Sequence, residues 1–343
     1  MLYIILFGLF FLFACSDERV NVWLFRASFL LILLLTCFRS PSLGIDTADG
    51  YFKYFQYIQD GLTLRWVEPF WILLNKLAIW MGLGYQGVLI FSGIISLIPV
   101  YYVINKTCVN KCFALSIYYG LYFVLFSFNL VRQNIAISVA LLAMYFYFEK
   151  KTYLAIVCIF VGFMFHHSVL LVLFLPLFVK IKVGLGKTII LLIVSFFLGL
   201  LIRDQFFFYV AGSYAGNLLS DDGYSGFRTS IVVPAIFTIV FNVFFVTILF
   251  SHLKNFSKNP WYLVVLAGVI MTNLTLRLGQ GTRVVLYFSV AQAIFFPNYI
   301  RTIDDKNDKF IISILYVCFI GVNFIRMLIS QWDTVCPYSF FWQ

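Results

Sequence analysis

The chain has 343 residues, of which 63% are hydrophobic and only 11% are charged. A soluble domain normally carries about 25% charged residues, so this composition excludes an ordinary soluble enzyme and indicates a membrane protein. The net charge of +10 comes largely from basic residues in short loops between apolar runs. That distribution is typical of the positive-inside rule of membrane proteins and gives no reason to expect a nucleic-acid partner.

Long apolar runs predict an all-α, polytopic membrane protein with about 11 to 13 transmembrane helices in a single integral-membrane domain, residues 1–343. Membrane-spanning backbone must be helical or part of a closed barrel, and these runs lack the alternation of barrel strands. We expect helices over residues 2–15, 21–38, 86–104, 112–127, 132–148, 152–166, 168–180, 187–202, 230–251, 260–276, 283–299 and 310–330.

Two stretches interrupt this pattern and are expected outside the membrane. Residues 39–85 are polar at first and then contain an apolar run, 69–83, which Asn75 and Lys76 interrupt. We predict that this run is an amphipathic half-helix in the outer interface. Residues 203–229 form a second long external loop, whose dense aromatic side chains could stack on sugars and close over a site.

The two basic residue types separate across the membrane in this topology. Eleven of the thirteen lysines fall in the loops expected inside, which are 105–111, 149–151, 180–187, 252–259 and 301–309. Eight of the eleven arginines fall outside or at outer helix ends: Arg39, Arg65, Arg132, Arg203, Arg228, Arg277, Arg283 and Arg326. An orientation rule alone does not explain the outer arginines, so they favour an anion-binding site there.

The first external stretch carries charged candidate site residues. Arg39 offers a rigid fork of donors suited to phosphate or carboxylate oxygens. Asp46 could orient a sugar hydroxyl, act as a general base or pair with Arg39. Glu68 precedes Pro69 at the start of the half-helix, where the helix N-terminus favours a carboxylate, and it could also face Asp46 as a second carboxylate.

Further candidates lie at the outer ends of later helices. Arg132 and Gln133 form a donor cluster beside two long apolar runs, and an arginine at membrane depth is by default a candidate site residue. His166 and His167 break an apolar hairpin at the same level, and histidine allows proton transfer near neutral pH. Their alternative roles are snorkelling for the arginine and a structural turn for the histidines.

Arg277 and Arg283 lie in a glycine-containing turn that Tyr287 follows. Several arginines directed at one space would suit a diphosphate in a region of low dielectric constant. A zinc site is not expected, because the one remaining histidine, His252, falls inside and the cysteines do not converge. The sequence therefore predicts a diphosphate site that uses no metal.

These features, in this order, resemble the EpsG-like family of polysaccharide polymerases, which is related in function to the Wzy O-antigen polymerases. The marks of that family are FR-x-x-x-x-G-x-D-[ST]-x-x-Y, then E-P, then [NR]-x-x-R-Q-x-x-A, then [FL]-H-x-S and then R-x-x-x-Y-F. They match residues 38–51, 68–69, 129–136, 165–168 and 283–288. One departure is Phe70, which stands where the family often has glycine.

The resemblance implies a GT-C-like, metal-independent glycosyltransferase of the bacterial inner (plasma) membrane that needs no cofactor. It would polymerise undecaprenyl-diphosphate-linked oligosaccharide repeat units into O-antigen, capsule or exopolysaccharide at the periplasmic or external face. The implied partners are those glycans and the lipid bilayer, and a Wzz-type chain-length regulator is compatible with the same reaction.

The resemblance also implies roles for the candidate residues. Arg132, Arg283 and either Arg39 or Arg277 would stabilise the diphosphates, and His166 with Asp46 or Glu68 would activate or orient the acceptor hydroxyl. The other substrate-binding residues would be Tyr51, Gln133, His167 and Tyr287. Two alternatives stay open: an O-antigen ligase or other transferase with the same lipid donor, and a flippase for lipid-linked sugars.

Overall fold

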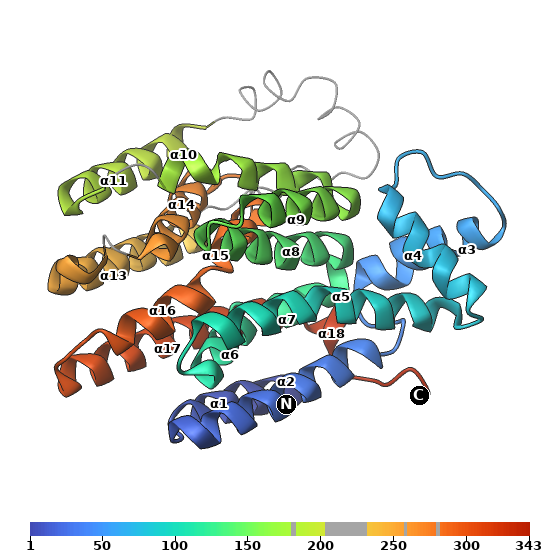
Figure 1. Cartoon of the computed structure of the whole chain (residues 1–343), viewed down its shortest axis with the longest axis horizontal. Coiled ribbons are helices and arrows are strands. Elements are labelled where there is room, and N and C mark those ends of the chain that lie inside the picture. Colours follow the sequence, from blue (N-terminus) through green and yellow to red (C-terminus); the bar gives the residue numbers. More distant parts are fainter. Residues whose placement is uncertain (180–182, 203–231, 257–258, 279–281) are drawn as a thin grey trace. The chain divides into compact units, whose positions relative to one another are not determined.

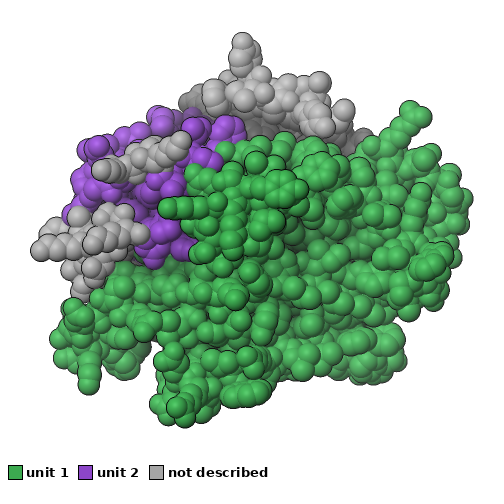
Figure 2. All heavy atoms as spheres, in the orientation of Figure 1, with its two compact units in different colours: residues 1–173, 292–343 green, residues 174–291 purple. Residues whose placement is uncertain are grey.

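The structure is a computed structural model that describes residues 1–179, 183–202, 232–256, 259–278 and 282–343. These residues form helices and no β-strand (Figure 1). They divide into two compact units, of which the first contains residues 1–173 and 292–343 and the second residues 174–291 (Figure 2). The predicted external loop 203–229 lies outside the described residues.

The first unit contains most of the helices. They are α1 (Leu2–Ala14), α2 (Glu18–Cys37), the π-helix η1 (Asp46–Tyr51), α3 (Phe52–Gln59), α4 (Pro69–Trp80), α5 (Gly84–Thr107), α6 (Lys111–Gly120), α7 (Phe123–Asn129), α8 (Val131–Phe148), α9 (Thr152–Phe165), the 3₁₀ helix η2 (His167–Phe174), α16 (Gln292–Arg301), α17 (Lys306–Ser330) and α18 (Trp332–Val335).

Local sequence explains where several of these helices begin. The side chain of Asn110 accepts a hydrogen bond from the amide of Phe113 and caps α6, and Asp305 caps α17 in the same way. Pro69 occupies the first turn of α4, where its missing N–H costs nothing. The expected half-helix over 69–83 is therefore a twelve-residue helix that starts directly after Glu68.

The second unit consists of α10 (Leu175–Val179), α11 (Leu185–Leu201), α13 (Val232–Phe256), α14 (Pro260–Leu274) and α15 (Thr282–Ser289). Gly199 of α11 packs against the backbone of α14 so closely that a Cβ would stand 1.9 Å from the carbonyl oxygen of Asn273. The amide of Asn273 donates to the hydroxyl of Ser195 at 2.8 Å and accepts from Asn242 at 2.9 Å. Asparagine side chains thus join α11, α13 and α14 by hydrogen bonds.

The helices confirm the all-α, multi-pass membrane class. By length and composition α2, α5, α8 and α17 are each able to cross a membrane, and α6 with α7, bent by 44°, makes a fifth when the pair is counted as one span. Shorter apolar helices cover residues 2–14, 152–165, 167–179, 185–201, 232–247 and 260–274. The count of about 11 to 13 spans, which includes such shorter helices, stays a prediction, as does the single domain.

Two helices predicted as continuous are broken. The run 112–127 becomes α6 and α7, because Tyr122 adopts a left-handed conformation with φ of 73°. The run 283–299 becomes α15 and α16, with residues 290 and 291 between them. The structure also adds η1 and α3 inside the stretch 39–68, for which no helix was expected. The amphipathic pattern of α3, with Phe55 and Ile58 buried, is short and lies next to turn residues. For this reason the sequence contains no clear indication of a helix there.

Candidate functional site

A glycine fixes the course of the loop between α2 and η1. Gly44 has a φ of 95°, and a Cβ on it would lie 2.1 Å from the carbonyl oxygen of Phe128. Only glycine suits both the left-handed conformation and this close approach. The loop therefore packs directly on the junction of α7 and α8, next to the first turn of α8 that carries Arg132.

The π-helix η1 is fixed to the same junction. Thr47 donates a short hydrogen bond from its hydroxyl to the carbonyl of Phe128, and the backbone carbonyl of Thr47 accepts from the hydroxyl of Tyr85 at 3.0 Å. Single-turn π-helices occur frequently at functional sites. Asp46 begins η1 and is partly exposed, whereas Tyr51 ends it and is buried.

Arg132 and Glu68 form an ion pair, with Nη1 of the arginine donating to Oε2 of the carboxylate. The arginine side chain is 19% exposed and the glutamate side chain 8%. The guanidinium lies over the rings of Tyr51 and Tyr54, with its central carbon 5.4 Å and 5.7 Å from the ring centroids. Two predicted catalytic or binding residues and one predicted tyrosine thus meet in one place.

A hydrophobic core supports this ion pair. The core contains Tyr51 of η1 and several residues of α4 and α8. It also contains Phe165 at the end of α9. The members from α4 and α8 include Trp71, Leu74, Val131 and Ile135. The ring of Phe70 packs edge-on against that of Phe165 at 5.7 Å. Glu68, Arg132 and the end of α9 are therefore held by one packed core within the first unit.

Arg39, a predicted substrate-binding residue, is completely buried. Its guanidinium donates to the backbone carbonyls of Thr36 at 2.8 Å and Ser127 at 3.1 Å and lies over the ring of Phe128. Within the described residues no carboxylate contacts it. Burial lowers the pKa of Arg39 to about 10, so the group is still a cation at neutral pH. In this structure Arg39 joins α2 to α7 and does not line an open surface.

His166 ends α9, and its ring is partly exposed. Its Nδ1 lies 2.8 Å from the hydroxyl and 3.4 Å from the amide of Ser168. An amide can only donate, so Nδ1 is an acceptor and the proton of the neutral ring is on Nε2. His167 is exposed and packs on the ring of Phe163 at 4.7 Å. The first histidine is thus the oriented one of the two.

The remaining predicted residues lie elsewhere. Gln133 is buried in the first turn of α8. Arg277, Arg283 and Tyr287 belong to the second unit, where Arg277 is partly exposed, Arg283 is exposed and Tyr287 is buried. Residues 279–281 of their predicted turn lie outside the described residues. The structure brings Tyr51, Glu68 and Arg132 together in the first unit. Arg277 and Arg283 belong to the second unit.

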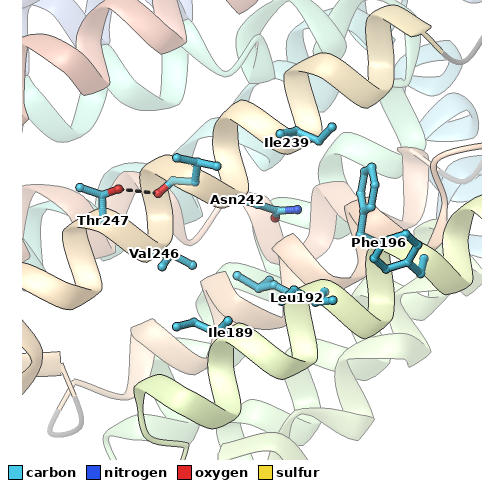
Figure 3. Close-up of a pocket in the computed structure, with 10 residues that line it drawn as sticks. Ile189, Leu192, Phe196, Ile239, Asn242, Val246 and Thr247 are labelled. Atoms are coloured by element: carbon cyan, nitrogen blue, oxygen red, sulfur yellow. Dashed lines mark hydrogen bonds between the residues drawn. The ribbon is translucent and has the colours of Figure 1, made fainter.

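A cavity in the second unit contains none of the predicted site residues. It lies between α11 and α13 and has a volume of about 280 Å³ (Figure 3). Its lining is almost entirely apolar, with Asn242 and Thr247 as the polar members. It offers no charged group for a diphosphate. Nor do the described residues gather three or more metal-binding side chains anywhere.

The protein-family model described as the EpsG family matches residues 22–340. The chain belongs to the EpsG family. This family is associated with exopolysaccharide biosynthesis. No curated protein and no solved structure matches the chain.

The EpsG match covers every residue of the ion pair and its aromatic wall. Sequence reasoning missed Tyr54, which contacts Arg132 together with Tyr51. Its signal was available, because Tyr51 and Tyr54 are three residues apart, the spacing that places side chains on one face of a helix. It also missed the role of Phe128, whose carbonyl oxygen accepts from Thr47 and whose ring lies under Arg39.

Proposed function

We propose that this protein polymerises undecaprenyl-diphosphate-linked repeat units at the outer face of the plasma membrane. The observation that carries the proposal is the Arg132–Glu68 ion pair beside Tyr51 and Tyr54, in a membrane protein of a family associated with exopolysaccharide biosynthesis. An arginine held by a carboxylate and two rings is preorganised, and preorganised donors stabilise charge that develops in a transition state.

The reaction would be a glycosyl transfer without a nucleotide. The bond between the anomeric carbon of the growing chain and its diphosphate breaks, and a bond from that carbon to a hydroxyl oxygen of the incoming repeat unit forms. The diphosphate leaves with the bonding electrons, and Arg132 neutralises part of its charge. Arginine suits this task because its planar fork binds phosphate oxygens in pairs.

The hydroxyl proton needs an acceptor. Glu68 already accepts from Arg132, so its role in this scheme is to orient the guanidinium. His166 accepts at Nδ1 from Ser168 and would donate from Nε2 to an oxygen of the substrate. Asp46, which is partly exposed at the start of η1, would then take the proton. The sugar rings would stack on aromatic side chains of the same outer surface.

The decisive test is polymerisation by the purified protein in detergent with lipid-linked repeat units. The wild type should give a ladder of longer lipid-linked glycans, and Arg132→Ala should lower the rate of extension at least about 100-fold, the scale of losing one charge-stabilising donor. The matched control is Arg65→Ala, which removes another arginine of the outer stretch that is exposed.

Each outcome of this experiment is decisive. Extension at the wild-type rate by Arg132→Ala, in protein recovered at the wild-type level, would contradict the role of the arginine. Equal losses in Arg132→Ala and Arg65→Ala would indicate a general charge effect. A wild-type protein that leaves authentic substrate as single repeats, beside an active control polymerase, would contradict the proposed function itself.

A further inference from the structure

The last part of the chain lies against the loop that precedes the candidate site. Residues 331–341, named here the C-terminal clamp, follow α17 and include α18. The clamp and the loop exchange backbone hydrogen bonds in both directions. The bonds run from Gly44 to the carbonyl of Thr334 (2.8 Å), from Ser40 to the carbonyl of Ser339 (2.9 Å) and from Phe341 to the carbonyl of Phe38 (3.0 Å).

Side chains of the clamp reach two further helices. The amide of Asn129, at the end of α7, donates to the side-chain carbonyl of Gln331 at 2.8 Å. The hydroxyl of Tyr338 donates to the backbone carbonyl of Leu35 in α2, also at 2.8 Å. The clamp therefore contacts the loop that leads into η1 and the α7–α8 junction that precedes Arg132.

Short stretches of backbone connect these contacts to the ion pair. Asn129 is three residues before Arg132, and Leu130 between them is the cap of α8. Gly44 is three residues before Thr47, which bonds to Phe128, and η1 then leads to Tyr51 under the guanidinium of Arg132. Displacement of the clamp would thus shift Arg132 through Asn129 and shift Tyr51 through Gly44 and η1.

We infer that the C-terminal clamp is a positioning element of the candidate site, and that Gln331 and Asn129 position Arg132 for transfer. This inference rests on the proposed function. It assigns a role in that function to residues 331–341, which lie far from the site residues in the sequence. None of the clamp residues needs to touch substrate. Their effect would be geometric, because a misplacement of about 1 Å at a reacting centre can cost two orders of magnitude in rate.

The kinetic test uses Gln331→Ala, Asn129→Ala and the double variant in the full-length protein. Each single variant should lower kcat about tenfold and leave KM within about twofold, because binding residues stay in place while the reactive geometry loosens. The double variant should be no slower than the slower single variant, since both remove one shared contact. Ser330→Ala is the matched control, because the hydroxyl of Ser330 bonds only within α17 and is exposed.

A second measurement follows the loop without any enzyme assay. Hydrogen–deuterium exchange of the amides of Ser40 and Gly44 should be faster in Gln331→Ala than in the wild type or in Ser330→Ala. Unchanged exchange together with unchanged kcat would overturn the inference. If the wild type transfers no glycan, the proposed function fails, and the exchange result alone decides whether the clamp holds the loop.

Discussion

Arg132 illustrates how a charged residue at the end of an apolar helix acquires its surroundings. Its sequence position indicates a functional cation, and the structure gives it a carboxylate and two aromatic rings. Removing one member of a buried ion pair typically costs about 3 to 5 kcal/mol, because the other charge is left without compensation. Glu68 and Arg132 are therefore best understood as one unit with a shared effect on folding and on transfer.

The role of Glu68 can be separated from that of Arg132 by Glu68→Gln, which keeps the shape of the side chain and removes its charge. The positive charge of the Arg132 guanidinium would then lack its compensating carboxylate, and the guanidinium would be held less firmly in its orientation. We expect a kcat at least about tenfold lower with a KM for the lipid-linked donor that does not rise, because donor attraction persists while preorganisation is lost. Initial rates over a series of donor concentrations measure both constants. A higher KM at unchanged kcat would contradict the orienting role.

Gly44 provides a prediction about stability. Alanine at this position would combine a left-handed conformation with a Cβ 2.1 Å from the carbonyl oxygen of Phe128. The conformation alone costs about 1 to 3 kcal/mol, and the overlap adds to that cost. Gly44→Ala should lower the melting temperature of the detergent-purified protein by several degrees.

Gly50→Ala is the matched control for that measurement. Gly50 lies in η1, and nothing stands within 4 Å of the position of its Cβ. Its melting temperature should stay close to that of the wild type. Equal melting temperatures for Gly44→Ala and the wild type would show that the loop adjusts its path on the α7–α8 junction.

At the scale of elements, hydrophobicity located most helices within a few residues. The α4 half-helix was expected from its apolar run, and it buries Trp71, Leu74 and Ala78 while Leu73, Leu77 and Trp80 are exposed. This exposed face repeats at the helical spacing and suits the interfacial position expected from the sequence. The interfacial position of α4 stays a prediction.

The breaks in the helices could not be predicted in the same way. The run 112–127 is apolar throughout, and the left-handed Tyr122 that divides it packs against Phe324, which lies far away in the sequence. Hydropathy contains no signal for such a break. Conversely, η1 and α3 are held by contacts with Phe128, Tyr85 and the core, which a polar loop sequence does not reveal.

At the scale of the whole molecule, topology decides whether the Arg132–Glu68 pair faces the outside. The separation of lysine from arginine predicts that Asp49, exposed in η1, lies outside and that Lys106, near the turn between α5 and α6, lies inside. In a chain whose own seven cysteines are replaced, an impermeant maleimide should label Asp49→Cys in intact spheroplasts. Lys106→Cys should be labelled only after lysis.

The opposite labelling pattern would reverse the predicted orientation and remove the external site. Labelling of both cysteines in intact cells would instead indicate an even number of spans between the two positions. The experiment is independent of any assumption about substrate.

Tyr51, Glu68 and Arg132 could be singled out from the sequence, but their contacts with one another could not. Arg132 and Glu68 stand out because they border apolar runs in a chain with only 11% charged residues, yet their mutual contact joins positions 64 residues apart. Residue type alone assigned Arg39 to phosphate binding, whereas the structure buries it against backbone carbonyls. Such pairings depend on tertiary distances, which single-sequence patterns do not contain.

The contact of residues 331–341 with the loop between α2 and η1 has a consequence for biogenesis. Synthesis proceeds from the N-terminus, so Gly44 and Asn129 leave the ribosome long before the residues that bond to them at positions 334 and 331. A nascent chain can insert its helices early and still lack the contacts around Arg132. A nascent chain that has not yet reached residues 331–341 would therefore lack a complete site.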